Sequence, residues 1–158
     1  MWLQHLSDSL PDLGHRNWII VADAAYPEMV YPGIVTLNSH QALMPVLIQV
    51  MDLLDKARHV TPDVVLDREW FDLSDEECPG ISRLRLEAKA LFDGLKVEPV
   101  WHGDLLSLLA EISQTYTIIV IKTTSTLPYT SVFLRLECGY WTEDQERNFR
   151  MRLGEDEA

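Results

Sequence analysis

Short apolar runs alternate along the chain with segments in which apolar residues recur every three or four positions. The apolar runs are residues 18–22, 63–67, 97–101 and 117–122. Runs of this length with polar residues at their ends are typical of buried β-strands. Residues 132–137 direct alternate side chains to two faces, which predicts a fifth strand.

Three segments between these strands have the apolar spacing of amphipathic helices. They cover residues 43–55, 81–95 and 105–112. Pro45 interrupts the first pattern, so this helix should begin near Leu43. The acidic stretch 72–77 is interpreted as a solvated connection.

The alternation of strands and helices predicts one α/β domain with a layered fold and a mostly parallel sheet. Residues 123–130 are too few for a crossover helix, so we expect the last two strands to form an antiparallel C-terminal hairpin. The domain should span residues 1–140. The charged tail, residues 141–158, is expected to be a loose surface helix or disordered.

Charge and composition narrow the possible partners and the compartment. The chain has 25 Asp and Glu against 13 Lys and Arg, a net charge of -12, which argues against nucleic acid and anionic membrane surfaces as partners. No apolar run reaches the roughly 18 residues of a membrane span, and no secretory signal is visible. Cys78 and Cys138 have neither disulfide-framework nor zinc-site spacing, so we expect a cytoplasmic protein.

The motifs that bind nucleotides, form hydrolase triads or hold catalytic zinc are missing from the sequence, so no cofactor or metal is expected. Four polar residues at the ends of the predicted elements are candidates for chemistry instead. His15 precedes the first strand, and an imidazole exchanges protons near neutral pH. The alternative for His15 is an ordinary surface histidine in a loop.

The other three candidates also have structural interpretations. Asp23 follows the first strand, where it could orient an imidazole, bind sugar hydroxyls or cap a turn. Tyr129 follows Pro128 in the last connection and lies either at the tip of a turn or in the core. His102 precedes the third helix, and its structural alternative is a residue of the turn that begins this helix.

Two stretches of the chain resemble one family. Residues 13–27 (LGHRNWIIVADAAYP) resemble the LGHxDxIxxxDAxxP opening of the RbsD/FucU family, the D-ribose pyranases and L-fucose mutarotases. Residues 121–134 (IKTTSTLPYTSVFL) resemble its IRTGExxPYxNxxL segment. Ser125 stands where the family usually has Glu, and Ser131 where it usually has Asn. The resemblance extends over about residues 10–140.

The resemblance implies an RbsD-like fold and an isomerase that interconverts anomers or ring forms of a free monosaccharide without a cofactor. It assigns the acid/base role to His15, and to Asp23 the orientation of His15 or the binding of a hydroxyl. Tyr129 and Ser131, with His102, would hold the sugar. Family members assemble as rings, often decamers of two stacked pentamers, so the resemblance also implies a homo-oligomer whose sites are completed by neighbouring subunits.

The chemistry fits the residues independently of the resemblance. Opening a hemiacetal requires removal of a proton from the anomeric hydroxyl and delivery of one to the ring oxygen, which a group titrating near neutral pH can perform. One alternative is a non-catalytic sugar-binding or regulatory oligomer on the same scaffold. Another is a phosphosugar enzyme, which would need more basic residues than Arg16 and Lys122 supply.

Overall fold

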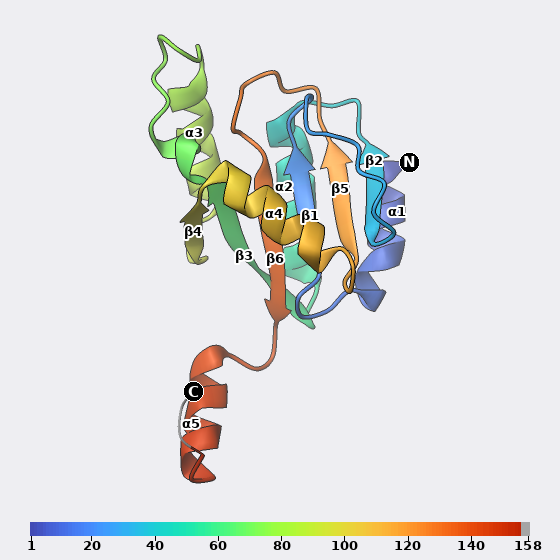
Figure 1. Ribbon diagram of the computed structural model, residues 1–158, viewed down its shortest axis with the longest axis vertical. Helices are drawn as coiled ribbons and strands as arrows, with labels where there is room; N and C mark the ends of the chain where they lie inside the picture. Colours follow the sequence, from blue (N-terminus) through green and yellow to red (C-terminus); the bar gives the residue numbers. More distant parts are fainter. Residues whose placement is uncertain (156–158) are drawn as a thin grey trace.

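The computed structural model describes residues 1–155. Its helices and strands follow each other along the chain as labelled in Figure 1. They are α1 (Trp2–Ser9), β1 (Trp18–Ala22), β2 (Ile34–Asn38), α2 (Leu43–Lys56), β3 (Val60–Asp67), α3 (Ile81–Leu91), β4 (Val97–Val100), α4 (His102–Ile112), β5 (Ile118–Lys122), β6 (Val132–Cys138) and α5 (Glu143–Arg152). Two 3-10 turns, Leu10–Asp12 and Arg68–Phe71, follow α1 and β3.

The strands form one six-stranded mixed sheet in the order β2-β5-β1-β6-β3-β4. Strand β6 is antiparallel to both of its neighbours, β1 and β3, whereas every other pair is parallel. The predicted α/β domain with a mostly parallel sheet and one antiparallel strand is therefore confirmed. The antiparallel strand lies inside the sheet and not at its edge.

The predicted hairpin between the last two strands is wrong, because β1 lies between β5 and β6. The connection crosses the end of β1 and is tied to it by backbone hydrogen bonds. The N–H of Thr123 donates to the carbonyl of Ala22 at 2.9 Å, and that of Ala24 to Ser125 at 2.7 Å. A step over one strand spans only about 10 Å, which the nine residues 123–131 cover easily.

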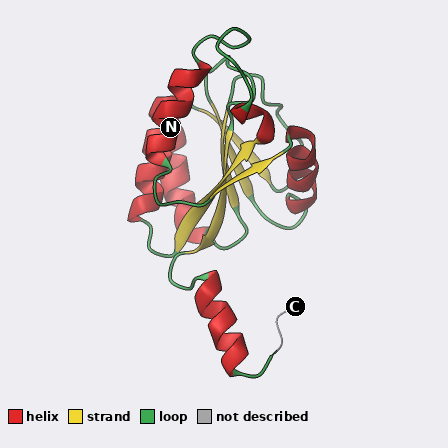
Figure 2. Ribbon diagram, turned by 90° about the vertical axis from the view of Figure 1, so that its left-hand side faces the viewer, coloured by secondary structure: helices red, strands yellow, loops and turns green. Residues whose placement is uncertain are grey.

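Helices cover both faces of the sheet (Figure 2). Helices α1, α2 and α3 pack on one face, while α4 packs on the other. Each face of the sheet has its own apolar core. Strand β1 is buried along its whole length because Ile19 and Val21 pack into the core under α1, α2 and α3, and Trp18 and Ile20 pack into the core under α4. This two-sided burial explains why its sequence is continuously apolar.

Most predicted elements are present with shifted ends. Helix α2 begins at Leu43 as predicted, α4 begins at His102, and α3 ends at Leu91, before the predicted end. The sequence analysis missed α1 and β2. Strand β2 is an edge strand that pairs only with β5 and stays partly exposed, so its apolar pattern is weak.

The tail contains a helix, so the helical alternative is confirmed for residues 143–152. A capping box begins α5: the Thr142 hydroxyl accepts from the Gln145 backbone, and the Gln145 side chain accepts from the Thr142 backbone. Helix α5 extends away from the domain (Figure 1) and contains no buried residue. Residues 156–158 of the predicted tail lie outside the described residues. Within residues 1–155, no helix is both long and apolar enough to cross a membrane.

Candidate functional site

The sheet register brings the ends of β1, β3 and β4 and the start of β6 together. The side of the sheet at which they meet is called one edge below, in contrast to its outermost strands. Val132, the first residue of β6, pairs with Val21 near the end of β1 and with Leu66 near the end of β3. Asp67, the last residue of β3, pairs with Val100, the last residue of β4. The residues just beyond these pairs, Asp23, Ser131 and His102, therefore meet Asp67 at the same edge.

The Ser131 hydroxyl both donates a hydrogen bond to Asp23 and accepts one from it. Its hydroxyl donates to Oδ1 of Asp23 at 2.5 Å and accepts from the Asp23 backbone N–H at 2.9 Å. Ser131 is buried and Asp23 is partly exposed. The carboxylate is thus fixed at the end of β1, and Oδ2 takes no hydrogen bond from any group in residues 1–155.

His102 begins α4 and is held by two acidic residues, one at the end of β3 and one in the 3-10 turn that follows it. Its Nδ1 lies 2.9 Å from Oδ1 of Asp67, in a hydrogen bond. Its backbone N–H donates to Oε1 of Glu69 at 3.0 Å. The Asp67 side chain is 1% exposed, and among the described residues its Oδ2 has no hydrogen-bond partner. Burial raises the pKa of Asp67, and the bond to His102 opposes that shift.

Tyr129 stands next to His102. The two rings meet edge to face with their centroids 5.5 Å apart. Tyr129 is 37% exposed, so the alternative that it packs in the core is wrong. Its backbone φ of 58° lies in the left-handed region, which tyrosine adopts at a cost and which is found repeatedly at functional sites.

The sequence analysis missed two residues of this site, Asp67 and Tyr26. Asp67 was visible as a strand end, but nothing in the sequence pairs it with a histidine 35 positions later. Tyr26 is buried against Phe133, with ring centroids 6.1 Å apart. Burial, followed by the charges of Asp67 and Asp23, raises the pKa of the Tyr26 phenol.

His15 lies at the opposite edge of the sheet, in the turn that precedes β1. The N–H of Asn17 closes this turn on the carbonyl of Gly14 at 3.1 Å. Nδ1 of His15 is 2.6 Å from Oε2 of Glu137 at the end of β6, and the His15 side chain is 53% exposed. Strand β1, about 16 Å long at five residues, separates His15 from Asp23. The structure therefore brings Asp23, Ser131, His102 and Tyr129 to one edge but leaves His15 at the other.

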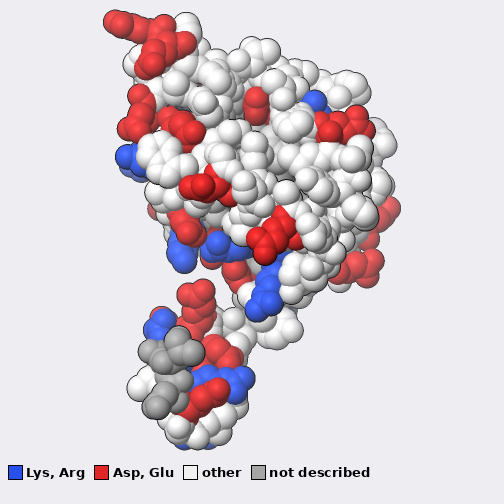
Figure 3. Space-filling model, in the orientation of Figure 1, with Lys and Arg blue, Asp and Glu red and all other residues white. Residues whose placement is uncertain are grey.

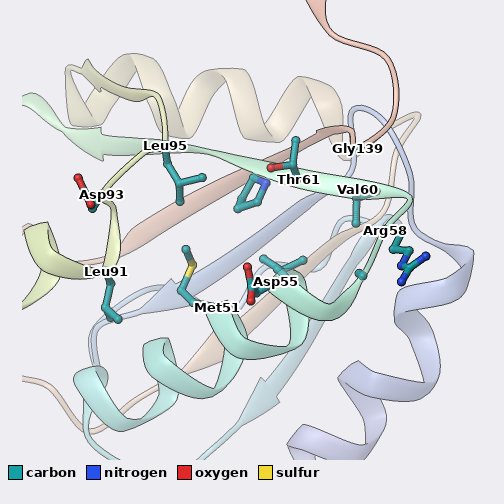
Figure 4. A pocket seen from close by; sticks show the side chains of 12 residues that line it. Met51, Asp55, Arg58, Val60, Thr61, Leu91, Asp93, Leu95 and Gly139 are labelled. Atoms are coloured by element: carbon teal, nitrogen blue, oxygen red, sulfur yellow. The ribbon is translucent and has the colours of Figure 1, made fainter.

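A hollow of about 630 Å³ lies beside His15, between the sheet and the start of α5. Its lining includes Asp63, Lys96, Glu137 and Trp141. Another hollow, of about 520 Å³, opens between α2, β3 and the segment after α3, with Met51, Asp55 and Leu95 around it (Figure 4). None of the candidate residues lines that second hollow.

The distribution of charged side chains and the metal-ligating residues were also compared with these sites. Acidic side chains spread over the face of the domain seen in Figure 3, while most of the visible Lys and Arg atoms lie toward its lower end and on α5. Across the described part of the chain, no group of three or more His, Cys, Asp or Glu residues could hold a metal ion.

The chain was compared with known proteins. No family model matches it. It is 32% identical over 137 residues to the D-ribose pyranase of Streptomyces avermitilis, covering 86% of this chain and 92% of that protein. Bacillus subtilis RbsD complexed with D-ribose has the same fold, with a TM-score of 0.61 and 21% identity over 84% of this chain and 91% of that one. The Streptococcus pneumoniae fucose mutarotase in complex with L-fucose has a TM-score of 0.55 and 18% identity, over 84% of this chain and 91% of that one. The identity to the pyranase over most of both chains shows that this chain belongs to the RbsD/FucU family of D-ribose pyranases and fucose mutarotases.

Proposed function

We propose that the protein is an isomerase that interconverts ring forms or anomers of a free monosaccharide such as D-ribose or L-fucose. The observation that carries the proposal is the convergence of Asp23, Ser131, His102 and Tyr129 at one sheet edge in a member of this family. A sugar presents hydroxyl groups, and this edge offers a carboxylate, an imidazole and a phenol to bind them.

The reaction needs only proton transfer. A proton leaves the anomeric hydroxyl, the bond between C1 and the ring oxygen breaks, and the ring oxygen gains a proton; closure reverses these steps. His15 serves as the acid/base. The carboxylate of Asp23 binds a hydroxyl through its open oxygen, and Tyr129 and His102 hold the sugar. Ser131 is buried and contributes to sugar binding through the Asp23 carboxylate that it fixes. No cofactor takes part in this scheme.

The active form is a homo-oligomer, because His15 cannot reach Asp23 within one chain. In the proposed assembly, a ring such as a decamer, His15 of one subunit faces the Asp23 edge of its neighbour. Nucleic acid and membranes are not partners of a chain with a net charge of -12. We place the protein in the cytoplasm, where the free thiols Cys78 and Cys138 remain reduced.

A second candidate is a non-catalytic sugar-binding or regulatory oligomer on the same scaffold. One observation favours it: Ser131 is buried, and its hydroxyl already donates its only proton to Asp23 and accepts a hydrogen bond from the Asp23 backbone. The asparagine that the family usually has at this position would offer an amide to the sugar. The activity test below distinguishes the two candidates.

The test is proton NMR with saturation of the anomeric signals of D-ribose, L-fucose, L-rhamnose, D-galactose and D-glucose. We expect protein-dependent exchange for at least one sugar. His15→Ala should abolish the exchange, and the matched control His5→Ala, at an exposed position on α1, should retain it. A folded wild-type protein that binds a sugar without exchanging any would support the second candidate.

A further inference from the structure

The imidazole of His102 is held by a carboxylate that is itself buried. The Asp67 side chain is 1% exposed, against 34% for His102, and the two meet at 2.9 Å between Oδ1 and Nδ1. Glu69 holds the backbone N–H of His102 at 3.0 Å. The ring of His102 is therefore fixed by the last residue of β3, and its backbone by a residue of the 3-10 turn that follows β3.

The sheet register explains why Asp67 reaches this position. Asp67 ends β3 opposite Val100, which ends β4, and His102 follows two residues later as the first residue of α4. Because β3 and β4 are parallel and end side by side, the last residue of β3 lies next to the start of α4, the helix that follows β4. A side chain packed in this interior cannot swing away from the imidazole.

A carboxylate at Nδ1 determines what the other ring nitrogen can do. Ionised Asp67 accepts a hydrogen bond from the Nδ1–H group, so the neutral ring carries its free lone pair on Nε2. When Nε2 takes up a proton, the adjacent carboxylate stabilises the imidazolium. Nε2 can then both accept and return a proton. A residue that only binds a sugar hydroxyl needs a hydrogen-bond donor or acceptor but no such proton exchange.

His102 is also well placed to touch the sugar. The edge-to-face contact puts its ring beside Tyr129, whose exposed phenol is among the proposed sugar-binding groups. The Asp23 carboxylate lies at the same sheet edge.

We propose that His102 is a second proton-exchanging residue alongside His15, and that Asp67 is its positioning residue. This inference rests on the proposed function. In ring opening, one neutral imidazole takes the proton of the anomeric hydroxyl, whose oxygen forms the C=O bond with C1. The bond from C1 to the ring oxygen breaks with its electron pair on that oxygen, which the other, protonated imidazole protonates. Closure runs the same transfers backwards and restores both imidazoles.

His102→Gln separates holding a hydroxyl from exchanging a proton, because an amide donates and accepts hydrogen bonds but does not titrate. We expect kcat for exchange to fall about 100-fold while KM stays within about twofold of wild type. If His102 only holds the sugar, the variant keeps most of the wild-type kcat, and the proposal is wrong.

Asp67→Asn tests the positioning role. The amide can donate to Nδ1, which moves the proton of the neutral imidazole to Nε2. We expect kcat to fall about 100-fold and the ¹⁵N spectrum of His102 to show the proton on Nε2 in place of Nδ1. Asp104→Asn is the matched control, because it makes the same carboxylate-to-amide change at an exposed position of α4, two residues after His102. It should retain the wild-type rate and tautomer.

The outcomes separate this inference from the proposed function. A wild-type rate and tautomer in Asp67→Asn would show that Asp67 does not position His102. If Asp67→Asn does not fold, as judged by thermal unfolding, His102→Gln at its partly exposed position still decides the proton-exchange role. If the wild-type protein exchanges no sugar, the proposed function fails and the catalytic role of His102 fails with it. The ¹⁵N spectra, which need no sugar, then still test whether Asp67 sets the tautomer.

Discussion

His15 precedes strand β1 and Asp23 follows it, so the two residues lie at opposite ends of the same strand. Both belong to the stretch that resembles the family's opening motif, yet the strand between them is about 16 Å long. A single monosaccharide is much shorter than that strand. The two residues can therefore act on one sugar only if they come from two subunits.

This arrangement predicts that two inactive variants restore each other. His15→Ala and Asp23→Asn should each lower exchange by about 100-fold or more. Co-expressed in equal amounts, they should recover activity, because about a quarter of randomly mixed sites then contain both intact residues. Native mass spectrometry confirms that mixed oligomers form. Mixed oligomers without recovered activity would place both residues of a site on one chain.

The bond between Ser131 and Asp23 predicts a defect in activity and a smaller one in stability. Ser131→Ala removes the donor to Oδ1 and the acceptor for the Asp23 backbone N–H. We expect kcat/KM for exchange to fall about 10-fold and the free energy of unfolding to drop by about 1 to 2 kcal/mol. The control Ser107→Ala, at an exposed position on α4, should change neither value. Wild-type kcat/KM in Ser131→Ala would contradict the role of this bond.

The raised pKa of Asp67 predicts a trend of stability with pH. Burial raises the pKa of Asp67 in the folded protein above the ordinary value of 3.8. Protonated Asp67 thus favours folding below that ordinary value, and this contribution is lost as pH rises through the raised pKa. Asp67→Asn does not titrate there.

Urea unfolding of wild type and Asp67→Asn between about pH 4 and about pH 8 should show wild type losing stability relative to the variant as pH rises, by about 1.4 kcal/mol per unit of pKa shift. Comparing the two proteins at each pH cancels the titration of the groups they share. A stability difference that stays constant with pH would contradict the raised pKa.

Gly33 is predicted to tolerate no side chain. A Cβ there would overlap the carbonyl oxygen of Ser113 and lie 2.8 Å from that of Tyr116, both backbone atoms. Gly33→Ala should lower the free energy of unfolding by about 3 kcal/mol, measured by urea denaturation. A Cβ at Gly103 in α4 would meet no described atom within 4 Å apart from its own helix backbone, so Gly103→Ala should be neutral or about 0.5 kcal/mol more stable. Equal effects at both positions would contradict the close approach at Gly33.

Helix α5 is predicted to contribute little to the stability of the domain, because it has no buried residue. A chain that ends at Trp141 should keep its free energy of unfolding within about 1 kcal/mol of the full chain. This experiment also tests whether the domain is complete within residues 1–140. Loss of folding in the shortened chain would show that the tail belongs to the domain.

The sequence by itself determined most of the buried segments and whether each is a strand or a helix, although it missed α1 and β2. The continuous apolar run of β1 and the helical spacing of α2 reflect local burial, which hydrophobic periodicity reports directly. The family resemblance was also visible in the sequence, in the residues around His15, Asp23 and Tyr129. These features are local, so no knowledge of strand pairing was needed to find them.

Only the tertiary structure decided which strands pair and which side chains meet. The period of a strand does not reveal its neighbours, so the position of β6 between β1 and β3 could not be predicted. That position places Ser131 against Asp23, and the pairing of β3 with β4 places Asp67 against His102. The same sheet keeps His15 away from them, because a strand must run its full length between its two ends.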